Sequence, residues 1–108
     1  MATVLIIDDQ EDLRFSLSKV VKKRGYTVMT AADGQRAMEL LSSSIVDLIF
    51  LDIGLPDING LELIPKIRLL DPEIDIVMLT GDNDARSAVQ ALRAGAMDYI
   101  VKPFDRGE

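Results

Sequence analysis

Residues 48–52 of this chain read Leu-Ile-Phe-Leu-Asp, in which four large apolar residues are followed at once by a carboxylate. The run does not alternate apolar and polar positions, which is typical of a parallel strand buried on both faces of its sheet. If similar runs are its neighbours, their carboxyl ends share one edge, where open α/β sheets bind ligands. Three such runs also stop at polar residues: Val4–Ile7 at Asp8-Asp9, Ile76–Leu79 at Thr80, and Tyr99–Val101 at Lys102.

The segments between the runs have the period of amphipathic helices, so the chain predicts βαβ units and a parallel sheet. One more strand is expected at 26–31, and the strand that contains Ile76–Leu79 is expected to begin at residue 74. Glycines after the helical stripes are expected to end helices, and a capping residue is expected to begin one. The predicted stripes are Leu13, Leu17, Val20 and Val21 ending at Gly25; Ala37, Leu40 and Leu41 after the cap Asp33; Leu61, Ile64 and Ile67 after Asn59-Gly60, with Pro65 near the first turn; and residues 84–94 ending at Gly95.

The composition is that of a single soluble domain and excludes several kinds of site. The chain has 108 residues, 48% of them hydrophobic, a net charge of −6 and no dense basic run, so direct binding to nucleic acid or anionic lipid is not expected. It has no cysteine and no histidine, which excludes disulfides, thiol nucleophiles, Ser/His/Asp triads and histidine-ligated zinc. No apolar stretch approaches the roughly 20 residues that span a bilayer, so a cytoplasmic protein is expected.

The three acidic residues at strand ends indicate a metal site. Unit charges 4 Å apart repel by about 4 kcal/mol at an effective dielectric near 20, so Asp8, Asp9 and Asp52 need a cation or must take up protons. Mg²⁺ fits because it binds a few carboxylates, keeps waters and is completed by phosphate oxygens. Near such an ion Asp52 can act as a nucleophile, while Thr80 and Lys102 supply a hydroxyl and a positive charge to a phosphoryl group.

Each of these residues also has an ordinary explanation. Asp8 and Asp9 can begin a solvated loop or cap the next helix, Thr80 can be structural, and Lys102 can be a surface charge. The combination favours phosphoryl chemistry over the separate explanations, because all of these side chains are predicted at one edge of the sheet.

At these positions the sequence resembles the receiver domain of two-component response regulators. The resemblance covers almost the whole chain, and residues 95–105 are most similar to receivers of nitrogen-regulatory-type transcription activators. It implies an α/β fold, a flavodoxin-like doubly wound five-stranded parallel sheet in the order 2-1-3-4-5. The matching stretches are Asp8-Asp9, Asp52–Gly60, Thr80-Gly81 and Tyr99–Phe104.

The resemblance implies a phosphoacceptor switch that catalyses only its own phosphorylation and dephosphorylation. Asp52 would accept a phosphoryl group from the phosphohistidine of a sensor histidine kinase. Mg²⁺ would be held by Asp8, Asp9, Asp52 and the backbone carbonyl of Gly54. The full-length protein would carry an effector domain, expected to be a DNA-binding transcription activator.

The resemblance also assigns roles to residues near the ends of the last two strands. Thr80 and Lys102 would bind phosphoryl oxygens, and Thr80 and Tyr99 would form the switch pair that changes partner binding. The peptide bond before Pro103 would be cis, a geometry that proline makes accessible.

The chain departs from the family pattern at two positions and at its end. Gly54 offers no side chain over the acceptor and Asp82 adds a negative charge, and both positions affect the lifetime of the phosphoryl group. Only residues 105–108 follow the Lys-Pro-Phe turn, where receivers carry a last helix. Residues 1–108 are therefore expected to be a receiver domain truncated before its final helix, with the sheet face beside the first helix open; otherwise a partner or a second copy, as in a homodimer, covers it.

Two of three rival functions would each require a different sequence pattern. A nucleotide-binding domain would place a glycine-rich turn after the first strand, where Asp8 to Asp12 would instead repel a pyrophosphate. An aspartate-nucleophile phosphatase would carry a second Asp two residues after the first, where this chain has Gly54. A receiver-like protein-binding module that works without phosphorylation is the remaining alternative.

Overall fold

The computed structural model describes residues 2–81 and 85–101 of the chain. Within these residues, parallel strands form one sheet in the order β2-β1-β3-β4-β5, which confirms the expected topology. The strands are β1 (Thr3–Ile7), β2 (Thr27–Ala31), β3 (Leu48–Asp52), β4 (Asp75–Thr80) and β5 (Asp98–Val101). The helices are α1 (Glu11–Lys23), α2 (Gly34–Ser43), α3 (Gly60–Leu70) and α4 (Ala85–Ala94).

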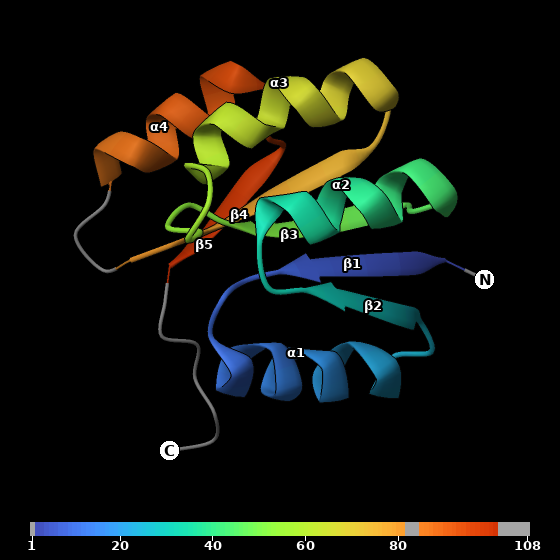
Figure 1. Ribbon diagram of the computed structural model, residues 1–108. Helices are drawn as coiled ribbons and strands as arrows, with labels where there is room; N and C mark the ends of the chain where they lie inside the picture. The colour runs from blue at the N-terminus through green and yellow to red at the C-terminus, as the bar shows by residue number, and fades with distance from the viewer. Residues whose placement is uncertain (1, 82–84, 102–108) are drawn as a thin grey trace.

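The helices cover the two faces of the sheet unequally. Figure 1 shows α2, α3 and α4 on one face, whereas the other face carries α1 alone among the described elements. The larger apolar cluster lies on the first face and includes Leu5, Ile49 and Ile64, while a smaller one beneath α1 is built on Val4, Ile6 and Val21. The sheet is therefore doubly wound, with its main core on the side of α2 and α3.

The burial of the strands explains their lack of alternation. Residues 4–7 of β1 are buried on both faces because β1 lies between β2 and β3 and helices pack on each side. In β3, Ile49 and Leu51 are fully buried toward the larger cluster, whereas Leu48 and Phe50 are only partly buried on the side of α1. The prediction that residues 48–51 are buried on both faces thus holds in part, because Leu48 and Phe50 are only partly buried.

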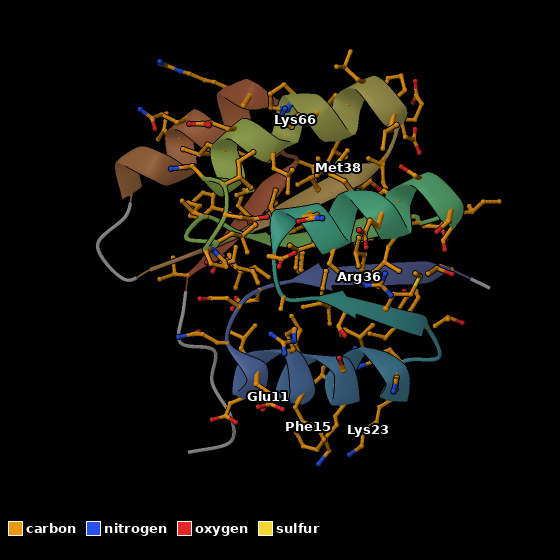
Figure 2. All side chains as sticks on the ribbon, in the orientation of Figure 1. Glu11, Phe15, Lys23, Arg36, Met38 and Lys66 are labelled. Carbon is orange, nitrogen blue, oxygen red and sulfur yellow. The ribbon has the colours of Figure 1, made fainter. Side chains whose placement is uncertain are left out.

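The end of α1 agrees with its sequence signal, but one position of its predicted stripe does not. Gly25 follows α1 with a φ of 93°, a left-handed conformation that suits glycine. Val21 is buried, whereas Val20 is 53% exposed. The reason is that α1 packs on β1 and β2, so the edge of its stripe that carries Val20 does not reach the sheet. Phe15 is 64% exposed and points away from the sheet (Figure 2).

The third helix begins earlier than its proline suggests. Asn59 is the N-cap of α3 and its side chain accepts a hydrogen bond from the backbone N–H of Leu61 at 2.8 Å. Pro65 therefore lies inside the helix, and the prediction that it lies near the first turn is wrong. Proline there removes one helical hydrogen bond, and the burial of Leu63, Ile64 and Ile67 against the sheet stabilises the helix despite this loss.

Candidate phosphoryl-acceptor site

The acidic residues converge because neighbouring parallel strands end at the same level. Ile7 of β1 pairs with Leu51 of β3, so Asp8 and Asp52 follow on adjacent strands at the carboxyl edge. Carboxylate oxygens of Asp8, Asp9 and Asp52 all lie within 4.8 Å of one another. Asp8 is fully buried and Asp52 is 7% exposed, while Asp9 is open to solvent. The structure thus brings together the three carboxylates that the sequence placed at strand ends.

Asp8 also organises the loop between β1 and α1. Its Oδ1 accepts a hydrogen bond from the backbone N–H of Gln10 at 2.8 Å, and its own N–H donates to the carbonyl of Ala31 at 3.0 Å. Gln10 is the N-cap of α1, and its side chain makes no capping hydrogen bond. Asp8 therefore combines a place in the acidic cluster with a structural role.

A cation from the first helix lies beside the cluster. The Nη1 of Arg14 donates to the backbone carbonyl of Asp8 at 2.8 Å. Its positive charge reduces the repulsion that clustered carboxylates create. The sequence signal for this contact was weak, because an arginine in the first turns of a helix is usually a solvated residue.

The loop after Asp52 is closed on itself and packs against the acceptor backbone. The N–H of Gly60 donates to the carbonyl of Ile53 at 2.7 Å, and Gly54 pairs with Asn59 in an antiparallel bridge. A Cβ on Gly60 would overlap the carbonyl oxygen of Asp52 and lie 2.8 Å from the Cα of Ile53. Glycine at position 60 therefore allows the start of α3 to touch the backbone of the predicted acceptor.

The remaining predicted site residues lie near the ends of β4 and β5. Thr80 ends β4 and pairs in register with Val101. The side chain of Thr80, together with Lys102 and Pro103, lies outside the part of the chain that the structure describes, and so does Asp82. Tyr99 of β5 pairs with Met78 and is 40% exposed.

The chemistry of the cluster fits a hard divalent cation. Its donors are carboxylate oxygens, two of them on nearly buried side chains, and burial of like charges is unfavourable without a compensating cation. Asp8, Asp9 and Asp52 are the residues that would hold Mg²⁺.

A separate groove lies away from this cluster. It has a volume of about 250 Å³ and runs between α2 and α3, where Figure 2 labels Met38 and Lys66 among its lining residues. Asp57 and Gly34 also line it. The residues that line the groove do not include those of the acidic cluster, so the two features are different parts of the molecule.

Within the described ranges, no helix has the length and apolar character required to cross a membrane.

A parallel sheet of order 2-1-3-4-5 with an acidic carboxyl edge defines a flavodoxin-like α/β domain with a ligand site at the strand ends. Residues 4–108 match the response regulator receiver domain family, and the chain belongs to that family. This confirms the resemblance on which the expected topology rested.

Known proteins agree with this assignment. The DNA-binding transcriptional regulator NtrC of Azospirillum brasilense is 35% identical over 107 residues, which cover 99% of this chain and 22% of the relative. NtrX of Brucella abortus has a TM-score of 0.92 and 35% identity, covering 97% of this chain and 24% of that one. The expected likeness to nitrogen-regulatory-type activators is thus confirmed.

A further structure shows a related protein with ligands. A response regulator protein from Burkholderia pseudomallei, solved with a phosphorylated aspartic acid, a calcium ion and citrate, has a TM-score of 0.89 and 33% identity, covering 97% of this chain and 62% of that one. The present chain spans 22–23% of the length of the first transcriptional regulators that it matches.

Proposed function

We propose that this chain is a Mg²⁺-dependent phosphoacceptor that takes a phosphoryl group from a histidine kinase onto Asp52. The observation that carries the proposal is the convergence of Asp8, Asp9 and Asp52 within 4.8 Å at the carboxyl edge of the sheet. The phosphorylated aspartic acid and calcium ion in the related Burkholderia protein support it. The donor must be a partner, because this chain contains no histidine.

In the transfer, a carboxylate oxygen of Asp52 attacks the phosphorus of the phosphohistidine. The new O–P bond forms as the P–N bond breaks, and the released imidazole takes a proton from water. A bound divalent cation would neutralise charge that develops on the phosphoryl oxygens. Asp8, Asp9, Asp52 and the backbone carbonyl of Gly54 would hold that cation, and Lys102 and Thr80 would bind phosphoryl oxygens.

The consequence of phosphorylation is a population shift between two arrangements of the surface around α4 and β5. Thr80 moves toward the phosphoryl group, and Tyr99 turns inward behind it. The partners are a sensor histidine kinase and an effector domain that activates transcription by binding DNA, in the cytoplasm. Direct contact of this chain with nucleic acid is not expected, given its net charge of −6.

The test is phosphorylation by a small-molecule phosphodonor with Mg²⁺, followed by the mass of the intact protein. Asp52→Asn is compared with Asp75→Asn, which removes an exposed carboxylate at the opposite, amino-terminal end of β4. We expect one phosphoryl group on the wild type and on Asp75→Asn, none on Asp52→Asn, and none on any protein after chelation of the metal. Equal labelling of both variants, or no labelling of any protein, would overturn the proposal.

A further inference from the structure

The first turn of α2 is held from two directions. The leading four N–H groups of an α-helix have no partner within the helix. In α2 the Asp33 carbonyl accepts the first intrahelical bond, from the N–H of Ala37 at 3.1 Å. Of the N–H groups before it, that of Arg36 donates to the carboxylate of the N-cap Asp33 at 2.8 Å. Those of Gly34 and Gln35 have their acceptor in a distant part of the chain.

That acceptor is Asp57, in the loop between β3 and α3. Its Oδ1 lies 2.8 Å from the N–H of Gly34 and its Oδ2 lies 2.9 Å from the N–H of Gln35. The same hydrogen bonds, led by that from Gly34, lower the pKa of the Asp57 carboxyl from its ordinary value of 3.8. One ionised carboxylate thus binds two successive amides across 22 and 23 positions of sequence.

A close packing contact accompanies these hydrogen bonds. A Cβ on Gly34 would lie 2.5 Å from the Cγ2 of Ile58 and 3.3 Å from the Oδ1 of Asp57. Any side chain at position 34 would push the loop away from α2. The loop therefore contacts α2 both through the Asp57 carboxylate and through van der Waals contact at Gly34.

The same loop begins at the acceptor. Asp52 ends β3, Ile53 donates its N–H to the carbonyl of Leu79 at 3.3 Å, and Gly60 packs on the backbone of Asp52. Gly54, whose carbonyl is proposed to bind the cation, lies between Ile53, which is hydrogen-bonded to Leu79, and Asp57, which is hydrogen-bonded to α2. The position of that carbonyl depends on how both ends of the loop are held.

From this geometry we infer that Asp57 is a positioning residue: by fastening the tip of the 53–59 loop to the start of α2, it sets the Gly54 carbonyl for the cation that serves Asp52. The inference rests on the proposed function and extends it to a residue that touches neither cation nor phosphoryl group. Because coupling between two sites is reciprocal, cation binding also stabilises the first turn of α2.

The test uses two alanine variants at the same helix end. Asp57→Ala removes the carboxylate that accepts from Gly34 and Gln35, and Asp33→Ala removes the carboxylate that accepts from Arg36. Each variant thus loses one carboxylate at the start of α2, but only Asp57 connects α2 to the loop. Backbone amide chemical shifts report Mg²⁺ affinity in a titration, and amide hydrogen exchange reports the opening of the first turn. Both variants are expected to speed exchange near residue 34 by about fivefold, the usual effect of a lost cap.

The two variants should differ in their affinity for Mg²⁺. We expect Asp57→Ala to bind Mg²⁺ roughly fivefold more weakly, at the lower end of coupling between sites, and Asp33→Ala to bind it as the wild type does. Equal Mg²⁺ affinities in all three proteins would mean that Asp57 acts only as a helix cap. Equal losses of Mg²⁺ affinity in both variants would mean that the affinity depends only on the missing negative charge. Either result overturns the inference.

A measurement on the wild type covers the case in which Asp57→Ala does not fold. Saturating Mg²⁺ should slow exchange at the Gly34 and Gln35 amides more than at amides in the last turn of α2. Uniform or absent slowing overturns the inference while leaving Asp52 as the acceptor. If the wild type shows no Mg²⁺-dependent shifts at Asp8, Asp9 and Asp52, the proposed function fails together with it.

Discussion

Replacement of Gly60 by alanine should destabilise the protein through one atom. The added Cβ would overlap the Asp52 carbonyl oxygen and press on the Ile53 Cα, both of them backbone atoms that cannot rotate away. Overpacking of this kind costs about 1–3 kcal/mol, and the upper part of that range applies because the obstacle is backbone. The better helix propensity of alanine offsets at most about 1 kcal/mol, so we expect a net loss of about 2 kcal/mol.

Urea unfolding followed by circular dichroism measures this loss. With a slope of about 2 kcal/mol per molar urea, the midpoint of Gly60→Ala should fall by about 1 M. Gly54→Ala in the same loop is the matched control, because a Cβ there meets no atom within 4 Å, and its midpoint should stay the same or rise slightly. Equal midpoints for the two variants would refute the packing argument.

Three further predictions concern other parts of the molecule. Arg68→Met should lower the free energy of unfolding by about 1–3 kcal/mol and speed amide exchange at the end of α4. The reason is that the guanidinium donates to the carbonyl of Gly95 at 2.6 Å and to carbonyls between α3 and β4. An unchanged urea midpoint would contradict this prediction. Since hydrogen bonds lower the pKa of Asp57 from 3.8, its stabilisation is present above that pH and is lost as the pH falls through the lower folded-state value. The stability difference between wild type and Asp57→Asn should therefore shrink on acidification below about pH 4, and a constant difference would count against the carboxylate. We also propose that an amphipathic helix appended to the C-terminus packs on the sheet face that carries α1, where Phe50 is partly buried and Ile100 is 38% exposed. The appended helix should raise the urea midpoint, and an unchanged midpoint would argue against this packing.

The strands and the acidic cluster were predictable from local sequence. An apolar run such as residues 48–51 indicates a buried parallel strand, and parallel strands bring the residues that follow them to one edge. The convergence of Asp8, Asp9 and Asp52 could therefore be predicted without knowledge of side-chain packing. The capping role of Asp33 was equally local, because the amide it binds lies only three residues away.

Contacts that depend on distant segments were not predictable in this way. The local sequence around Asp57 and Arg68 does not indicate the contacts that these residues make. Their partners Gly34 and Gly95 lie 23 and 27 positions away, and no periodic pattern encodes such a distance. The exposure of Val20 escaped prediction for the same reason, since it depends on which strands α1 covers.

Because β1 lies between β2 and β3, the acidic cluster forms only when the sheet folds, and not when its separate segments are synthesised. Asp8 and Asp52 become neighbours only when β1 and β3 pair across more than forty positions of chain, so no short peptide from this protein contains the cluster. The unfolded chain consequently offers a divalent cation only scattered carboxylates. A ligand of the cluster therefore binds almost exclusively to the native state. The melting temperature should consequently rise with the concentration of that ligand, by mass action.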